Sequence, residues 1–405
     1  EGDVSKEYPN MFWPFGQHIL EPTQLICQHP NLFAIFLTHH GCGPDSILSH
    51  YFRAEMKGKP YLHIEIDEHS SSVGIITRVE AFINSLKNVE IVQASDVNVY
   101  NSGIVHKEPN VKNNFDDIGD KRIVYLPYLY PYSHIIKEFM LKRGINAKVL
   151  PASSRSSIET GRKFTITEEY FSLTALLGNV FKTLHELDKN ELDNIAFLIP
   201  QNEGSETDGQ YSRLLRTKLD EEGFENVDII SPFEEDIISE NSEEIFREIC
   251  LSMLAGDIIW NAPLKSREKY FNLIIDLIKE GQFDLEQLKI LAQKIAEELD
   301  KEIFGKNILA VGELNILFDE LLNNYTFRNL EGKGNRVVYS PLSEVMWMMW
   351  KDYTIQNKND KTFMIEQRLK KLKDNICDIS KAMLNWSPFE TEQDDLILNA
   401  DRTLG

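Results

Sequence analysis

The sequence predicts an α/β fold, with Rossmann-like β-α-β lobes, parallel sheets and a helical insertion. Three segments repeat one order of elements: an apolar strand, a loop with Pro or Gly, an amphipathic helix, a Gly turn and a second strand. They span residues 123–151, 195–232 and 308–341. Each has about the length of a β-α-β unit, and such units build parallel sheets through right-handed crossovers.

The N-terminal part continues this alternation. Apolar strands are predicted at 33–37, 61–66 and 89–93, around helices at 46–56 and 75–87. The second helix carries apolar residues at helical spacing, with Arg78 and Glu80 off the stripe: Ile75, Ile76, Val79, Phe82, Ile83 and Leu86.

Two other regions depart from the repeat. Residues 233–305 are helical by periodicity, with an acidic outer face, and 94–120 is a candidate linker or long surface loop. The Met- and Trp-rich helix at 343–353 fits buried core, with a partner surface as the alternative. We expect four regions: an N-terminal α/β lobe (1–115), a second lobe (116–232), a helical region (233–305) and a truncated C-terminal α/β segment (306–405).

Composition narrows the class of protein. The chain has 405 residues, 42% hydrophobic and 26% charged, as is ordinary for a globular protein of more than one domain. A net charge of −21 argues against nucleic acid or an anionic membrane as the partner. No apolar run reaches membrane-spanning length, and the start has no signal-peptide pattern. Four cysteines without CxxC spacing suit a reducing cytoplasm. The chain begins with Glu and stops after a strand-like LIL, so we expect it to be a piece of a longer protein.

The densest polar chemistry lies in residues 39–80. The Gly41-Cys42-Gly43 turn leaves the first strand, and Pro44 fits the first position of the next helix. Ligands bind at such strand-to-helix turns in open α/β sheets. A thiol at a helix N-terminus has a lowered pKa, so Cys42 is a candidate nucleophile or metal ligand.

The strand HIEIDEH (63–69) admits two interpretations. Alternation puts His63, Glu65 and Asp67 on one face, and the strand's carboxyl end lies near the Cys42 turn. Glu65, Asp67, His69 and Cys42 could form a metal or acid/base site. In the alternative, Asp67 caps the next helix, His69 packs or faces water, and Glu65 pairs with Arg78.

A small-molecule pocket at these strand ends is the favoured hypothesis. Gly209-Gln210-Tyr211 also stands at a strand-to-helix loop. The pocket candidates are His39, His40, Cys42, Asp45, Ser46, Glu65, Asp67, Glu68, His69, Arg78, Gln210 and Tyr211. Cys27, Cys250 and Cys377 fit small buried hydrophobes, although Cys27 could approach Cys42 through the fold. Nothing in the chain matches a phosphate-binding, dinucleotide-binding, Ser-His-Asp or HExxH motif.

The strings LTHHGCGPDSILSHYF and KPYLHIEIDEHSSSVGIITRVEAFINSL resemble one family. The family consists of the large CoA-substrate-specific enzyme activase-related proteins of the 2-hydroxyacyl-CoA dehydratase system. The resemblance is to their dehydratase-like region, which lies downstream of the ATPase modules. Looser resemblance covers 161–178, 204–224 and 311–346. It implies a cytoplasmic protein of anaerobes with iron–sulfur chemistry, in which an actin-like ATPase module drives low-potential electrons to a partner dehydratase. It also implies an acyl-CoA or other small ligand, and ATP only through modules upstream of this chain.

The departures from the family concern its cysteines. Tyr170 stands where the family has Cys, and Ser205-Glu206-Thr207 stand where it has Pro-Cys-Arg. Cys42 remains, and one thiolate does not hold a [4Fe–4S] cluster. We therefore expect no cofactor in this chain, unless other ligands join Cys42 in an iron–sulfur site. Two functions remain open: an activase-related redox fragment whose own cluster site is degraded, or a non-catalytic binding or scaffolding module with the same fold and pocket.

Overall fold

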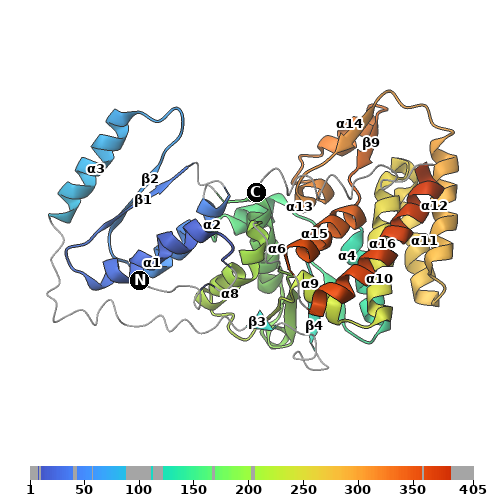
Figure 1. Ribbon diagram of the computed structural model, residues 1–405, viewed down its shortest axis with the longest axis horizontal. Helices are drawn as coiled ribbons and strands as arrows, with labels where there is room; N and C mark the ends of the chain where they lie inside the picture. Colours follow the sequence, from blue (N-terminus) through green and yellow to red (C-terminus); the bar gives the residue numbers. More distant parts are fainter. Residues whose placement is uncertain are drawn as a thin grey trace. The chain divides into compact units, whose positions relative to one another are not determined.

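The computed structural model describes Tyr8 and residues 11–39, 43–56, 58–87, 111–112, 122–166, 169–201, 206–357 and 360–384 (Figure 1). Its sheets are parallel and its strands alternate with helices, which confirms the predicted α/β class. The predicted strand at 89–93 lies outside the described residues. Of the predicted loop 94–120, only Val111–Lys112 is described, and it is a strand.

The chain divides into two compact units, each assembled from several segments. Unit 1 comprises residues 1–117, 155–193 and 199–231, and unit 2 comprises 118–154, 194–198 and 232–405. The four regions expected from the sequence are consecutive stretches, so their boundaries differ from this division. Among the described residues, no helix is long and apolar enough to cross a membrane.

Unit 1 contains two parallel strand pairs, β1–β2 and β3–β7, with helices around them. Its elements are α1 (Pro14–Gln28), β1 (Ala34–Thr38), α2 (Pro44–Met56), β2 (Tyr61–Glu65), α3 (Ser72–Leu86), β3 (Val111–Lys112), α5 (Arg155–Gly161), α6 (Phe171–Glu186), α7 (Lys189–Leu192), the 3-10 turn η3 (Thr207–Gln210), α8 (Tyr211–Glu221) and β7 (Asp228–Ile230).

The β1–β2 pair is covered unequally on its two faces. Alternate β1 residues are buried beside α2, where the Phe36 ring stacks on the Phe52 ring at 4.6 Å between centroids. Figure 1 shows α1 and α2 on one side of the pair and α3 on the other. On the α3 side Ile64 is buried, but Ile35 and Leu37 are 47% and 54% exposed. The outer face of β1 is therefore apolar and open.

Helices α5 and α6 approach each other through two glycines. A Cβ at Gly161 would overlap the Thr174 carbonyl of α6, and a Cβ at Gly178 would overlap the Ser157 carbonyl of α5. Only glycine allows two helix backbones to come this close. This contact fixes the start of α6, which enters the candidate site below.

Unit 2 contains the strand order β6-β4-β5 and the separate pair β8–β9, all parallel. Its elements are β4 (Ile123–Leu126), α4 (Tyr132–Lys142), β5 (Ala147–Val149), β6 (Ile195–Leu198), α9 (Glu234–Glu240), α10 (Glu243–Asn261), η4 (Leu264–Ser266), α11 (Arg267–Glu280), α12 (Leu285–Leu299), β8 (Asn307–Ala310), α13 (Leu314–Phe318), α14 (Thr326–Gly332), β9 (Arg336–Tyr339), α15 (Leu342–Gln356) and α16 (Asp360–Leu384).

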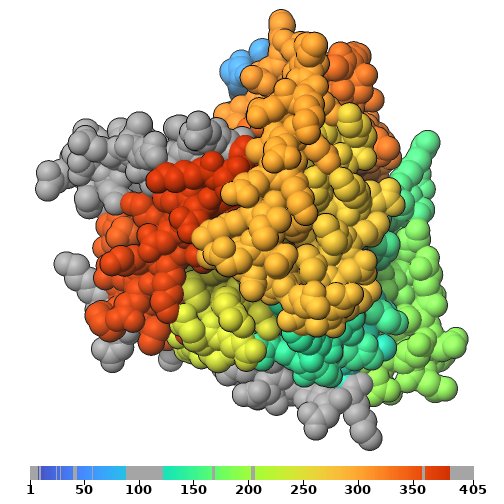
Figure 2. All heavy atoms as spheres, turned by 90° about the vertical axis from the view of Figure 1, so that its right-hand side faces the viewer, coloured from blue at the N-terminus to red at the C-terminus, as the bar shows by residue number. Residues whose placement is uncertain are grey.

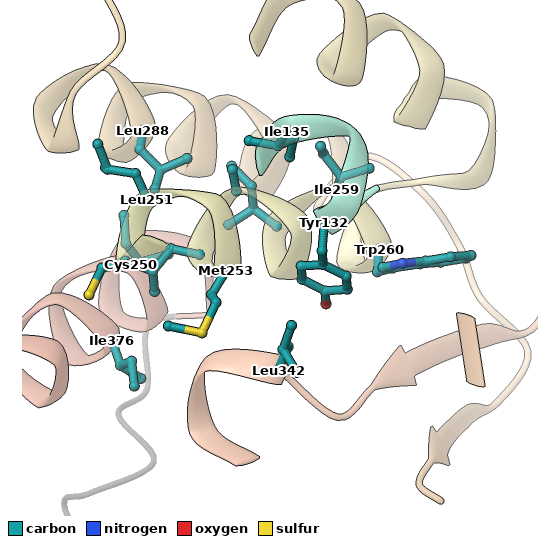
Figure 3. Close-up of a cluster of buried hydrophobic side chains, with 14 of the residues drawn as sticks. Tyr132, Ile135, Cys250, Leu251, Met253, Ile259, Trp260, Leu288, Leu342 and Ile376 are labelled. Carbon is teal, nitrogen blue, oxygen red and sulfur yellow. The ribbon is translucent and has the colours of Figure 1, made fainter. Parts of the chain in front are cut away.

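Helix α10 forms the centre of the unit 2 core. It packs against α4, α11, α12, α15 and α16, and residues all around it are buried, as expected of an internal helix. Figure 3 shows Cys250, Leu251 and Met253 of α10 among side chains of its neighbours. Figure 2 shows α12, in orange, beside α16, in red, on one face of the unit.

The helices predicted within 233–305 are confirmed as α9, α10, α11 and α12. Three of their ends are set by residues typical of helix caps. Ser242 caps α10 by accepting a hydrogen bond from the amide of Ile245 at 3.2 Å. Asp284 caps α12 in the same way through the amide of Gln287 at 2.9 Å. Helix α11 ends at Gly281, whose φ of 73° suits glycine.

The Met- and Trp-rich helix is α15, and its aromatic residues belong to the core. Trp347 and Trp350 are buried, and the Trp347 indole donates to the carbonyl of Leu369 in α16 at 3.2 Å. Met348 is 54% exposed. The core interpretation is therefore confirmed for the tryptophans.

Candidate functional site

The turn between β1 and α2 is closed by the first residues of α2. The amide of His39 donates to Asp45 Oδ2 at 3.1 Å, and the Ser46 hydroxyl donates to the Gly43 carbonyl at 2.9 Å. Gly43 has a φ of 62°, which explains glycine at this position. Pro44 is the first residue of α2, as predicted. His40 and Cys42 lie outside the described residues.

The carboxyl end of β2 lies beside this turn, because β1 and β2 are parallel neighbours. The Ile66 amide donates to the Thr38 carbonyl at 2.8 Å. Asp67 does not cap α3, whose N-cap is Ser71. Its Oδ1 instead accepts from the His69 amide at 2.9 Å and the Ser70 hydroxyl at 2.7 Å, so this carboxylate organises its own turn.

The remaining candidates from β2 and α3 face solvent. Glu68, His69 and Arg78 are exposed, and Glu65 is half-buried at the end of β2. Within the part of the chain that the structure describes, no group of three or more His, Cys, Asp or Glu residues could hold a metal ion. Glu65, Asp67 and His69 therefore do not assemble a metal site by themselves.

A buried polar cluster instead joins α2 to the start of α6. His50 Nε2 of α2 lies in close contact with Glu169 Oε1, and their side chains are 9% and 0% exposed. Glu169 Oε2 accepts from the Ile166 amide at 3.1 Å. The next residue, Tyr170, is the N-cap of α6, and its hydroxyl lies 3.8 Å from the position of a Cβ on Gly43.

The start of α8 joins the same cluster. The Tyr51 hydroxyl donates to Gln210 Oε1 at 2.9 Å. The Tyr211 hydroxyl lies 3.2 Å from Ser172 Oγ and 3.5 Å from Thr207 Oγ1. We call the assembled set the helix junction: Gly43, His50, Tyr51, Glu169, Tyr170, Ser172, Thr207, Gln210 and Tyr211. It brings two predicted candidates, Gln210 and Tyr211, against α2 and α6, within unit 1.

An arginine supplies positive charge next to the junction. The Arg213 guanidinium lies 4.5 Å from the centre of the Tyr8 ring and 5.8 Å from that of Tyr51. Burial raises the pKa of Tyr51 well above its usual value, although Arg213 opposes the shift. Tyr51 is therefore a neutral hydrogen-bond donor at physiological pH.

The described cysteines are not among the residues of the junction. Cys27 donates to the Glu55 carbonyl at 3.2 Å, in the last turn of α2. The Gly43 end of the junction lies roughly 18 Å from Glu55 at the rise of an α-helix, whereas Tyr51 lies about one turn from it. Cys250 and Cys377 belong to unit 2. The junction thus presents hydroxyl, amide, carboxylate and imidazole groups, and these donors do not fit an iron–sulfur cluster, which needs several thiolates.

Sequence reasoning named Tyr170 and Thr207 only as departures from the family, and it missed four other members of the junction: His50, Tyr51, Glu169 and Ser172. Glu169 and Ser172 sit in or just before the first turn of a helix, where Ser is a recognisable signal. His50 and Tyr51 lie inside α2, where no local pattern marks them. Comparison with known proteins adds no relative: no protein-family model, curated protein or solved structure matches this chain.

Proposed function

We propose that this chain is a dehydratase-like binding module of an activase-related protein, whose helix junction holds a small polar ligand. The observation that supports this is the meeting of α2, α6 and α8 around oxygen and nitrogen donors. By its resemblance to the family, the sequence has Tyr170 at one cysteine position and Thr207 directly after another. A hydroxyl-lined junction suits hydrogen bonding to a ligand, while electron storage would require thiolates.

Binding of an acyl thioester tests the proposal. Acetyl-CoA and coenzyme A are titrated into the whole chain by calorimetry, with Tyr211→Phe and Gln210→Ala as variants. We expect acetyl-CoA to bind and each variant to weaken binding by about threefold to tenfold, the value of one hydrogen bond. Tyr325→Phe, at an exposed tyrosine, is the matched control and leaves affinity unchanged. Absence of binding, or equal effects of the control and Tyr211→Phe, would contradict the proposal.

Anaerobic reconstitution with iron and sulfide tests the redox alternative. We expect the wild type to retain no more iron than Cys42→Ala and to show no charge-transfer absorbance in the visible region. Retention of about four irons per chain that disappears in Cys42→Ala would replace the binding module with a cluster-bearing redox fragment.

Thiol alkylation locates Cys42 relative to the ligand site. Cys27 and Cys250 are buried, and burial raises the pKa of Cys250 to about 12, so both should resist iodoacetamide at neutral pH. We expect Cys42 to react faster than these two, and acetyl-CoA to slow its reaction. The site is wrongly placed if mass spectrometry finds Cys42 inert in the native chain.

A further inference from the structure

In unit 2, a buried carboxylate on α10 caps another helix. Asp257 accepts from the amide of Leu342 at 2.7 Å, from the amide of Ser343 at 3.2 Å and from the Tyr132 hydroxyl at 2.9 Å. The two amides belong to the first turn of α15, whose N–H groups have no partner within the helix. Asp257 therefore holds the start of α15 against α10 and α4.

The neighbouring contacts show how closely these elements are joined. Figure 3 shows the Tyr132 hydroxyl directed toward Leu342 at the start of α15. A Cβ at Gly256 would overlap the Tyr132 ring, so glycine is needed beside Asp257. One turn further along α10, Asn261 Oδ1 accepts from the Tyr339 amide at the end of β9, at 3.1 Å.

A second carboxylate belongs to the same helix turn. Glu344 is half-buried in the first turn of α15 and directly follows Ser343, whose amide Asp257 accepts. Among the described residues, neither carboxylate pairs with a cation. Four cations of the surrounding elements have other partners. Lys361 contacts Asp236 and Glu240, and Arg368 donates to the carbonyls of Ile238 and Asn241. Lys373 lies over the Trp347 ring, and Arg267 contacts Glu331 and Tyr339.

We propose that Asp257 and Glu344 form a proton-dependent clamp on the start of α15. While the pair carries one proton, a single negative charge accepts the amides of α15. When both carboxylates are ionised, two negative charges share a largely dry site without a cation, and the first turn of α15 loosens. The clamp lies in unit 2 and does not depend on the helix junction.

The titration of the two groups agrees with this geometry. Burial raises the pKa of Asp257 to about 6, although its hydrogen bonds to Ser343 and Tyr132 oppose the shift. Burial, and then the charge of Asp257, raise the pKa of Glu344 to about 7. The second ionisation of the pair thus falls near neutral pH, and the two titrate as one coupled system.

Hydrogen exchange tests the clamp in the wild-type chain first. Protection factors for peptides covering 336–350, corrected for intrinsic exchange, are compared at about pH 6 and about pH 8. We expect the first turn of α15 to lose about tenfold in protection at the higher pH, while α12 does not change; a tenfold loss corresponds to about one unit of pKa shift. Equal protection at both pH values would overturn the proposal.

Two variants then separate the proton effect from helix stability. Glu344→Gln removes the second charge, so in this variant the protection of the first turn of α15 should stay the same at both pH values. Glu366→Gln, at an exposed position of α16, should lose protection as the wild type does. Glu344→Gln behaving like Glu366→Gln would also overturn the proposal.

Discussion

Arg267 is a charged residue in the core of unit 2. Its guanidinium makes two hydrogen bonds to the Glu331 carboxylate, and it lies 5.2 Å and 5.3 Å from the ring centres of Trp260 and Tyr339. Both charged side chains are less than a tenth exposed. A planar guanidinium can stack on rings while its edge binds a carboxylate, which lysine cannot reproduce.

Removing Glu331 from its buried pair with Arg267 should lower the unfolding free energy far more than breaking an ion pair on the surface. Glu331→Ala leaves Arg267 buried without its counter-charge, and we expect unfolding free energy to fall by about 3–5 kcal/mol. Glu159→Ala, which breaks the exposed Arg155–Glu159 pair, should cost less than about 0.5 kcal/mol. Urea unfolding measures both. Similar losses for the two variants would mean that Glu331 is not an essential partner.

At the level of single residues, the sequence located part of the candidate site. Pro44 at the start of α2 and the turn conformation of Gly43 were predicted correctly, because proline fixes φ and glycine accepts a positive φ. Gln210 and Tyr211 were named but not their partners, since the contacts of η3 with α2 and of α8 with α6 join residues far apart in the chain. The alternative in which Asp67 caps α3 does not hold, because its carboxylate accepts from His69 and Ser70 in its own turn.

At the level of elements, the α5–α6 contact depends on two glycines facing opposite carbonyls. Such a contact has no space for even one added methyl group, whereas Gly74 of α3 has no atom within 4 Å of an added Cβ. Replacement of glycine by alanine should therefore lower the unfolding free energy in α6 and raise it in α3.

Glycine-to-alanine substitutions in α6 and α3 test this contrast. Gly178→Ala should lower unfolding free energy by about 3 kcal/mol, because overpacking forces the helices apart. Gly74→Ala should raise it by about 0.5 kcal/mol, because alanine restricts the unfolded chain. Thermal and urea unfolding measure both changes. A Gly178→Ala chain as stable as the wild type would show that the helices are not held this closely.

Strand and helix positions were largely predictable, and their packing was not. β6 is buried at every residue, as its continuous apolar run suggests, but the equally apolar β1 is buried only at alternate residues. Hydropathy gives the two strands the same pattern, and only tertiary packing distinguishes them. Helices α1 and α6 were not predicted, and α1 carries an internal proline, Pro22, that obscures its periodicity.

For the whole molecule, acid stability should depend on His134. Burial, and then Lys137, lower its pKa to about 4. An unfolded histidine titrates near 6.5, so between about pH 6.5 and 4 the unfolded chain binds a proton that the folded chain does not. Unfolding free energy therefore falls as pH falls through that window.

Replacement of His134 should reduce this acid sensitivity. We expect His134→Gln to lose less unfolding free energy than the wild type between about pH 6.5 and 4.5, in urea titrations. His69→Gln removes an exposed histidine and should follow the wild type. Asp257 and Glu344 shift in the opposite direction, but they are present in all three chains and cancel in the comparison. A loss in His134→Gln equal to that of the wild type would contradict the assignment.

The open outer face of β1 has a consequence for how copies of this chain behave in solution. Parallel sheets are ordinarily covered on both faces, yet Ile35 and Leu37 stay exposed, as do Val73, Ile76 and Ile83 of α3. The net charge of −21 makes copies repel one another, and at about 0.1 M salt this repulsion reaches only about 10 Å. Light scattering should therefore show dispersed chains in dilute buffer and reversible clustering as salt is added, with Leu37→Gln raising the salt concentration required.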